Sequence, residues 1–385
     1  MRNSKTIYIL IILFAVALIP ACIEEYTPKV EDELSDILVV EGAISGGENT
    51  VIKLSRSVEL SAESTFNPVF GAVVYVERSD GWTSEPGNEA IIGEYHIRMG
   101  ELDTSLSYSI VIQTEGKEYR SKPAEPIITP AIDSLSWKKK GDGEPVTIHV
   151  TTHDTNSAVG YYRWSYKEDW EIHAAYFANG DYDFINEVYT PYLLDGLNTY
   201  YCWNSDSSRV LLLGDTEKLS GNLIYEKKLV TIEATHDKLS YLYSILVKQW
   251  TVSKQAYQYL SNLQNNIDEA GSIFAPQPSE LPGNVTCVTS PEEVVIGYID
   301  VATVTEKRLY ITEKEAHDPA RKPEQCKTES VEGKSNMIKL MQEEGLVLLD
   351  AAPDFFSATL TERRCVDCKY KGSKVKPDFW PNNHQ

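Results

Sequence analysis

Positive charge is scarce in this sequence of 385 residues. It has 36 lysines and arginines against 57 aspartates and glutamates, so the formal net charge at pH 7 is −21. A body this acidic repels phosphate backbones and anionic surfaces. The composition therefore argues against nucleic acid as a partner. Because the acids are scattered along the chain, they indicate a solvated surface more than a specific cation site.

Sequence signatures of catalysis are also missing. The seven histidines form no metalloprotease helix motif, and no Gly-x-Ser-x-Gly sequence supplies a nucleophile. His149 and His153 fall on one face of a predicted strand, but about 13 Å apart at ~3.3 Å per residue, which is too far to share one ion. We therefore expect a protein that is not an enzyme and that has no cofactor and no metal site.

The sequence has a single long hydrophobic run, which lies near the start of the chain. Residues 7–19 are continuously apolar and follow Arg2 and Lys5. This run suits a signal peptide and is too short to span a bilayer comfortably. Because Cys22 follows a small residue directly behind the run, we predict that residues 1–21 are removed and that acyl chains such as palmitate anchor Cys22 to a membrane. An ordinary secreted protein is the alternative.

The residues behind Cys22 indicate where the protein is sent. Residues 22–35 would form a lipid-anchored linker, and Glu24 and Glu25 within it resemble the signal by which Bacteroidetes direct lipoproteins to the outer face of the outer membrane. We therefore expect an outer-membrane protein, held by lipid at Cys22 and exposed at the cell surface.

The first folded region, residues 36–130, consists of short strands divided by turn residues, without a helical period of useful length. This spacing predicts a small β-sandwich. Pro123, Pro126 and Pro130 stiffen the chain behind it and mark a domain boundary. The order of the strand motifs resembles the immunoglobulin-like or prealbumin-like repeats found beside many outer-membrane transporters.

A larger β-rich domain is predicted over residues 131–316, which makes the fold mainly β. One helix is expected to interrupt it at about residues 253–268, with Ser253 as the N-cap. Two strands, at residues 294–299 and 309–312, are expected to close this second domain.

The C-terminal extension, residues 317–385, is mostly polar. It contains one predicted helix over residues 336–344, which ends at Gly345, a residue suited to the left-handed cap position. We expect cysteines, and not a core of its own, to hold this extension in place.

Apart from Cys22, the number of cysteines is odd. In a compartment where disulfides persist, an odd number leaves at least one cysteine free or paired between chains. Structural disulfides are the favoured interpretation, and the C-x-x-C spacing leaves zinc or redox chemistry as alternatives. The candidates for disulfide bonds are Cys202, Cys287, Cys326, Cys365 and Cys368.

An aromatic strand near residue 161 offers a candidate binding surface. Alternation places Tyr162, Trp164 and Tyr166 on one face, where they could be sandwich core or a stacking platform for a sugar or peptide. Trp170 follows, and Phe274 lies in a loop over residues 271–284. On the opposite face, Arg163 is expected to pair with a buried acid such as Glu171.

Two carboxylates beside Trp170 support a different function. Glycosidases use paired carboxylates to cleave sugars, so Glu168 and Glu171 could serve as acid and base in an extracellular glycan hydrolase. This interpretation requires both carboxylates to face one open cleft. A binding or scaffolding module is the favoured alternative.

Several segments together resemble the Bacteroidetes lipoproteins grouped as domain of unknown function 4249. The resemblance covers nearly the whole mature chain and includes Leu38-Val39-Val40-Glu41-Gly42, Pro68-Val69-Phe70-Gly71-Ala72, Tyr161-Tyr162-Arg163-Trp164-Ser165-Tyr166, Cys202-Trp203, Val295-Ile296-Gly297-Tyr298 and Cys365-Val366-Asp367-Cys368. Ala275 departs from the pattern, because the family often has an acidic residue there. The resemblance implies a lipoprotein accessory to a TonB-dependent outer-membrane receptor. The possible glycan or peptide ligand is suggested by the aromatic strand and not by the resemblance.

Overall fold

The computed structural model describes residues 36–382 except for residues 48, 59–65, 157–158, 184, 187, 192–198, 220, 270–282 and 353–355. The predicted signal peptide, Cys22, Glu24, Glu25 and Phe274 lie outside the described residues. Strands make up most of the regular structure, and helices occur at few places. The expected mainly β fold class is therefore confirmed.

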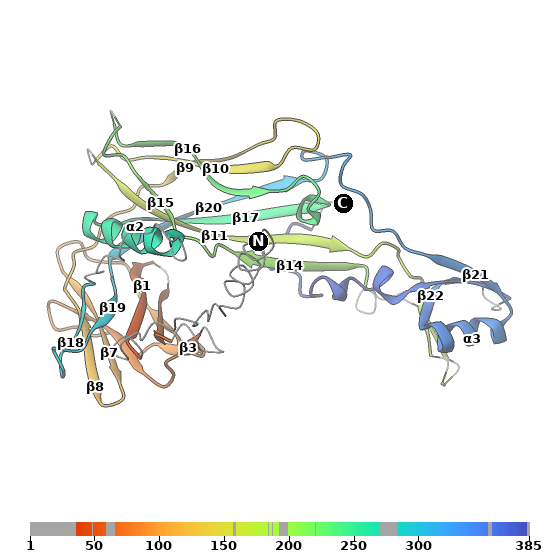
Figure 1. The fold of residues 1–385 in the computed structure, drawn as a ribbon, viewed down its shortest axis with the longest axis horizontal. Helices are drawn as coiled ribbons and strands as arrows, with labels where there is room; N and C mark the ends of the chain where they lie inside the picture. The colour runs from red at the N-terminus through yellow and green to blue at the C-terminus, as the bar shows by residue number, and fades with distance from the viewer. Residues whose placement is uncertain are drawn as a thin grey trace, which may run out of the picture.

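One long sheet runs through both β-rich domains (Figure 1). Its strands follow the order β14 (Tyr201–Ser207), β11 (Tyr161–His173), β17 (Leu242–Thr251), β20 (Val301–Thr312), β1 (Leu38–Gly46), β2 (Asn49–Arg56), β6 (Glu94–Arg98) and β5 (Asn88–Ile91). The link is β20, which pairs antiparallel with β17 along most of its length and parallel with β1 at its start. The two domains therefore share hydrogen-bonded strands.

The N-terminal domain is the predicted β-sandwich. A second sheet, in the order β18 (Val285–Cys287), β8 (Lys117–Ser121), β7 (Tyr108–Thr114) and β4 (Val73–Arg78), packs against β1, β2 and β6. Strand β2 alternates between buried and more exposed residues, as a strand with one face on a core does. Side chains from both sheets fill this core, among them Leu54, Val74, Tyr95, Ile112 and Tyr119.

The strand expected at residues 294–299 belongs to the first domain and not to the second. β19 (Val295–Gly297) pairs in parallel with β1, and β18 pairs with β8. The earlier placement was wrong because an apolar run shows that a strand is buried without showing which neighbour it pairs with. Gly297 allows the close pairing, since a Cβ there would lie 2.5 Å from the carbonyl oxygen of Val40.

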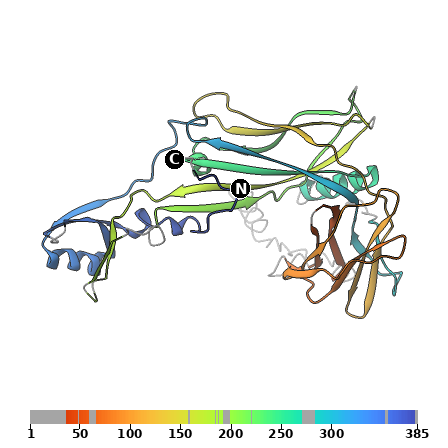
Figure 2. The same cartoon turned by 180° about the vertical axis from the view of Figure 1, so that it is seen from behind.

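The second domain is also a two-layer arrangement. A separate sheet of β16 (Leu223–Ile232), β10 (Val146–His153) and β9 (Ile132–Lys138) covers one face of β11 and β17, and Figures 1 and 2 show it as a layer along the central sheet. Its core includes Ile148, Val150, Trp164, Tyr243 and Ile245. Strand β15 (Leu212–Asp215) pairs with the first part of β11.

The expected helix is present as α2 (Lys254–Glu269). The Ser253 hydroxyl oxygen accepts a hydrogen bond from the backbone N–H of Ala256 at 3.1 Å, so Ser253 is the N-cap as predicted. Asp300 in turn accepts the backbone N–H of Ser253. Ala256 and Tyr259 are buried residues of the helix.

The C-terminal extension forms a small unit at the end of the molecule opposite the N-terminal sandwich (Figure 1). It consists of β21 (Thr328–Glu332), α3 (Lys334–Glu344), β22 (Leu346–Ala351) and β23 (Ser357–Glu362), beside the hairpin of β12 (Gly180–Asp183) and β13 (Val188–Pro191). Helix α3 ends at Gly345 with a φ of 67°, as predicted. The expectation that the extension lacks a core was wrong, because Met337, Met341 and Leu360 pack with Tyr182.

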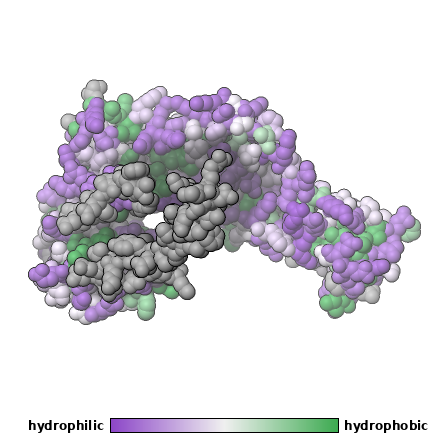
Figure 3. All heavy atoms as spheres, viewed as in Figure 1, coloured by the Kyte–Doolittle hydropathy of each residue, from purple (hydrophilic) through white to green (hydrophobic). Residues whose placement is uncertain are grey.

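No helix among the described residues is long and apolar enough to cross a membrane. On the face shown in Figure 3, hydrophobic side chains lie in separate areas among hydrophilic residues.

Candidate binding pocket

The aromatic strand β11 places two of its candidate residues in the core. Tyr162 and Trp164 are almost completely buried between the two layers of the second domain. The Trp164 indole N–H donates to the Gln249 side chain at 2.8 Å, and the Tyr162 hydroxyl donates to Asn222. Tyr166 is half-buried against the same core. The rings of Tyr162 and Trp164 therefore serve packing and offer no face to a ligand.

Trp170 and Glu168 point to this same core side. The Glu168 carboxylate accepts hydrogen bonds from the Tyr243 hydroxyl at 2.7 Å and from the Lys238 ammonium at 2.8 Å. The same ammonium lies 4.7 Å from the centre of the Trp170 ring. Burial raises the pKa of Tyr243 far above its usual value. Glu168 is thus a buried, fully engaged structural acid.

Glu171 lies on the opposite face of β11. The pairing of β11 with β14 and β17 runs without a register shift through this part of the strand, so residues three apart point to opposite sides. One Glu171 carboxylate oxygen contacts His173 Nε2 at 2.6 Å, and the other accepts the indole N–H of Trp380 at 3.0 Å. Glu168 and Glu171 therefore do not form the facing carboxylate pair that a glycosidase requires.

Arg163 does not pair with Glu171. Its guanidinium carbon lies 5.6 Å from the centre of the Trp250 ring. Burial of the guanidinium is the main cause that lowers its pKa. The expected ion pair was wrong because Arg163 and Glu171 share a strand face but lie eight residues apart, about 26 Å along a strand.

The structure brings together a group of rings that the sequence did not single out. His173, at the end of β11, stacks on Tyr241 with ring centres 3.5 Å apart and meets Tyr201 edge-on at 4.8 Å. Tyr200 lies 5.0 Å from the histidine ring and 4.8 Å from Tyr201. The four rings and Glu171 line a cavity of about 340 Å³, which we name the aromatic pocket.

The aromatic pocket offers both apolar ring faces and polar groups. Thr312, the last residue of β20, and the following Glu313 and Lys314 complete its lining. Burial raises the pKa of Tyr241 to about 12, so its hydroxyl keeps its proton and can donate a hydrogen bond at neutral pH. Such a combination of ring faces with a few convergent polar groups is typical of small-ligand sites.

The C-terminal tail is bonded to Glu171, a residue of the aromatic pocket. Trp380 is buried and bonds to Glu171, while the preceding Phe379 lies under the Arg308 guanidinium, 3.5 Å from its carbon. Tyr310 donates its hydroxyl proton to the carbonyl oxygen of Phe379 at 3.1 Å. The tail therefore fixes the carboxylate that in turn fixes His173.

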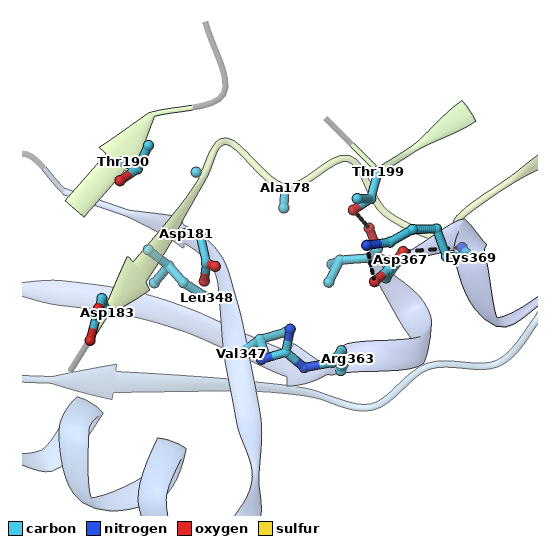
Figure 4. Close-up of a pocket in the computed structure, with 12 residues that line it drawn as sticks. Ala178, Asp181, Asp183, Thr190, Thr199, Val347, Leu348, Arg363, Asp367 and Lys369 are labelled. Atoms are coloured by element: carbon cyan, nitrogen blue, oxygen red, sulfur yellow. Dashed lines mark hydrogen bonds and ion pairs between the residues drawn. The ribbon is translucent and has the colours of Figure 1, made fainter. Parts of the chain in front are cut away.

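A second cavity of about 330 Å³ lies where the C-terminal unit meets the second domain (Figure 4). Acidic, basic and apolar residues all contribute to its lining. Asp367 accepts the backbone N–H of Lys369, and Thr199 donates its hydroxyl proton to the carbonyl oxygen of Val366. The residues that line this cavity carry charges of both signs and include no aromatic ring. The cavity is therefore less suited to an organic ligand than the aromatic pocket.

Four of the five candidate cysteines form disulfides. Cys202 bonds to Cys368 and Cys326 bonds to Cys365, while Cys287 is free and buried in the N-terminal sandwich. The two cysteines of the C-x-x-C sequence thus bond to different partners, and the expected structural disulfides are confirmed. Among the residues that the structure describes, no cluster of histidine, cysteine and acidic side chains could hold a metal ion.

These features define a multi-layered β protein with a cross-linked C-terminal tail and a ring-lined cavity. The chain belongs to the family described as Domain of unknown function (DUF4249), which matches residues 23–308. The match includes the four rings of the aromatic pocket and ends within β20, ahead of the C-terminal unit. No curated protein matches the chain.

Proposed function

We propose that this protein is a non-catalytic binding or scaffolding module that captures a glycan in the aromatic pocket. It is anchored to the outer membrane by lipid at Cys22, exposed at the cell surface, and accessory to a TonB-dependent transporter. The observation that supports a glycan as the ligand is the group of four rings around one cavity. Flat ring faces cover the apolar C–H face of a sugar at small entropic cost, while Glu313, Thr312 and the tyrosine hydroxyls can bond to its hydroxyls.

The anchor and the transporter rest on other observations. The family match begins at residue 23, directly behind the cysteine that the leader predicts to be acylated. The proposed association with a transporter is based on the resemblance of this family to lipoproteins that are accessory to TonB-dependent receptors. A glycan hydrolase is disfavoured because the two candidate carboxylates point to opposite faces of β11 and each already contacts two other side chains.

A ligand screen tests the pocket. We expect binding of a neutral oligosaccharide from a defined panel, measured by calorimetry, to weaken at least about tenfold in Tyr241→Ala and in Tyr200→Ala, because each removes a ring face. Tyr225→Ala is the matched control, since Tyr225 is an exposed tyrosine on β16 and does not line the aromatic pocket. Equal affinity in all variants, or binding of peptides but of no sugar, would contradict the glycan proposal.

Affinity purification tests the transporter. The full lipoprotein, purified from gently solubilised outer membranes, should bring with it a β-barrel receptor of the TonB-dependent class. Recovery of no such receptor, under conditions that preserve known receptor complexes, would count against the accessory role while leaving the ligand measurement unaffected.

A further inference from the structure

One end of the N-terminal sandwich carries exposed apolar side chains at the tips of neighbouring loops. Phe66, Phe70, Ile91 and Ile92 are 62%, 75%, 65% and 63% exposed. They flank β3 (Asn67–Pro68) and the turn between β5 and β6. We name these four residues the apolar end. Side chains this large are usually buried, and a group of them at one end marks an interaction surface.

The side chain of Glu89 holds these loops together. One Glu89 carboxylate oxygen accepts the backbone N–H of Gly71 and the other accepts that of Gly93, each at 3.0 Å. Gly93 also packs directly on Pro68, where a Cβ would lie 2.8 Å from the proline side chain. The tip residues are thus presented by a fixed scaffold, because the two loops are bonded through one side chain.

The first described residue, Asp36, lies at this same end. Asn67 pairs with Arg56, and the next residue, Ser57, accepts the backbone N–H of Asp36. Val294, 61% exposed, lies beside the start of β1 because Val295 pairs with Leu38. Figure 1 shows β3 at the lower right of the sandwich, below β1 in this view. The segment leading back to Cys22 therefore starts among the exposed apolar residues.

We propose that the apolar end is a membrane-contact surface that inserts its phenylalanine and isoleucine side chains into the interfacial region of the bilayer. This inference rests on the lipid anchor of the proposed function. Fourteen peptide units separate Cys22 from Asp36. They span about 50 Å when fully extended and about 20 Å as a relaxed coil. The anchor keeps the bilayer within reach of the apolar end, so a weak affinity for lipid suffices.

The charges around the apolar end determine which lipids matter. Glu89 and Glu115 lie beside it, and the basic side chain of Arg56 is engaged with Glu115 and Asp36. No uncompensated cluster of lysines and arginines faces outward among the described residues of this end. Contact therefore depends on apolar insertion, and we expect it to need no anionic lipid and to be insensitive to salt.

The test reports the depth of one tip residue. Residues 23–385 with an N-terminal hexahistidine tag are bound to phosphatidylcholine vesicles that contain a nickel-chelating lipid. Ile92→Cys carries an environment-sensitive nitrobenzoxadiazole dye. The other cysteines are in disulfides or buried, so the dye attaches to the new thiol. Tyr225→Cys, at a 71% exposed position on β16, is the control.

We expect a blue-shifted emission and quenching by spin-labelled lipid at position 92, and neither at position 225. Adding Phe70→Ser and Ile91→Ser should reduce the quenching at position 92 at least about threefold, whereas 0.5 M salt should leave it unchanged. Equal, solvent-like emission at both positions on the vesicles would overturn the proposal. A blue shift already present without vesicles, together with a dimer mass, would overturn it in favour of a second copy of the chain.

The nickel tether separates this test from the proposed anchor. Contact at position 92 is measured whether or not the cell acylates Cys22, and acylation is measured on the native protein by mass spectrometry. If one of these two measurements gives a negative result, the other can still be interpreted.

Discussion

Glu171 connects the aromatic pocket to the C-terminal tail through its two oxygens. Because the carboxylate is buried, each hydrogen bond that it accepts offsets a desolvation cost. The residue thus positions His173 in the wall of the aromatic pocket.

Removing the tail's donor tests this arrangement. Trp380→Phe keeps an aromatic ring but leaves one Glu171 oxygen without its indole N–H. We expect the free energy of unfolding in urea to fall by about 1–3 kcal/mol, and sugar binding to weaken as His173 loses its fixed position. Trp82→Phe, at a partly exposed tryptophan of the N-terminal sandwich, should change stability by less than about 0.5 kcal/mol. Equal stability of the two variants would contradict the role of the tail.

Asp318 gives a pH prediction. Its carboxylate is bonded to the Lys139 ammonium and to the backbone N–H groups of Ala320 and Gly143, which together lower its pKa to about 2. A depressed pKa contributes stability that is present above the unfolded value near 4 and is lost as the pH falls toward 2.

The matched measurement is the melting temperature from pH 5 to pH 2 for the native chain and for Asp318→Asn. The variant should melt lower at pH 5, and the difference should shrink as the pH approaches 2. A constant difference across this range would show that the carboxylate charge contributes nothing.

Single residues also show what the sequence could and could not predict. Strand alternation placed Tyr162 and Trp164 on one face correctly, but alternation alone does not say whether a face is core or surface. Tyr200 and Tyr201, at the start of β14, and Tyr241, directly before β17, were missed because the two starts lie far apart in sequence from each other and from His173. Only the register of β11 with β14 and the turn before β17 bring them to His173.

Among the elements, those with local signals were predictable and those defined by pairing were not. Helices α2 and α3 follow from apolar spacing, the Ser253 cap and Gly345. The partner of β19 is a long-range choice that no local pattern contains. The cysteine pairs are similar, since five cysteines allow many pairings and only the folded chain selects two.

The disulfide between Cys326 and Cys365 closes the chain over 39 residues around the C-terminal unit. Replacing both cysteines by serine should lower the free energy of unfolding of this unit by about 2–4 kcal/mol. Peptide mapping without reduction should recover the Cys202–Cys368 and Cys326–Cys365 pairs. Cys287→Ala, which removes a free thiol, is the control and should cost about 1 kcal/mol or less. Recovery of a Cys365–Cys368 pair would contradict the structure.

On the scale of the whole molecule, β20 joins the two domains, because it pairs with β1 of the first and with β17 of the second. The prolines after the first domain are the basis of the predicted domain boundary. The shared sheet could not be foreseen, because it depends on a strand from residues 301–312 that joins both. The aromatic pocket lies in the second domain, and the apolar end and the start of the described chain at Asp36 lie in the first. A protein tethered at that start would rest on the membrane by its first domain and hold the pocket away from the tether.

The central claim is that a lipid tether at Cys22 holds this binding module on the cell envelope. Mass spectrometry of the N-terminal peptide of the native protein, purified from membranes, tests it most directly. The account predicts that the chain begins at Cys22 and that this residue carries acyl chains. An unmodified amino terminus at any other residue would contradict it.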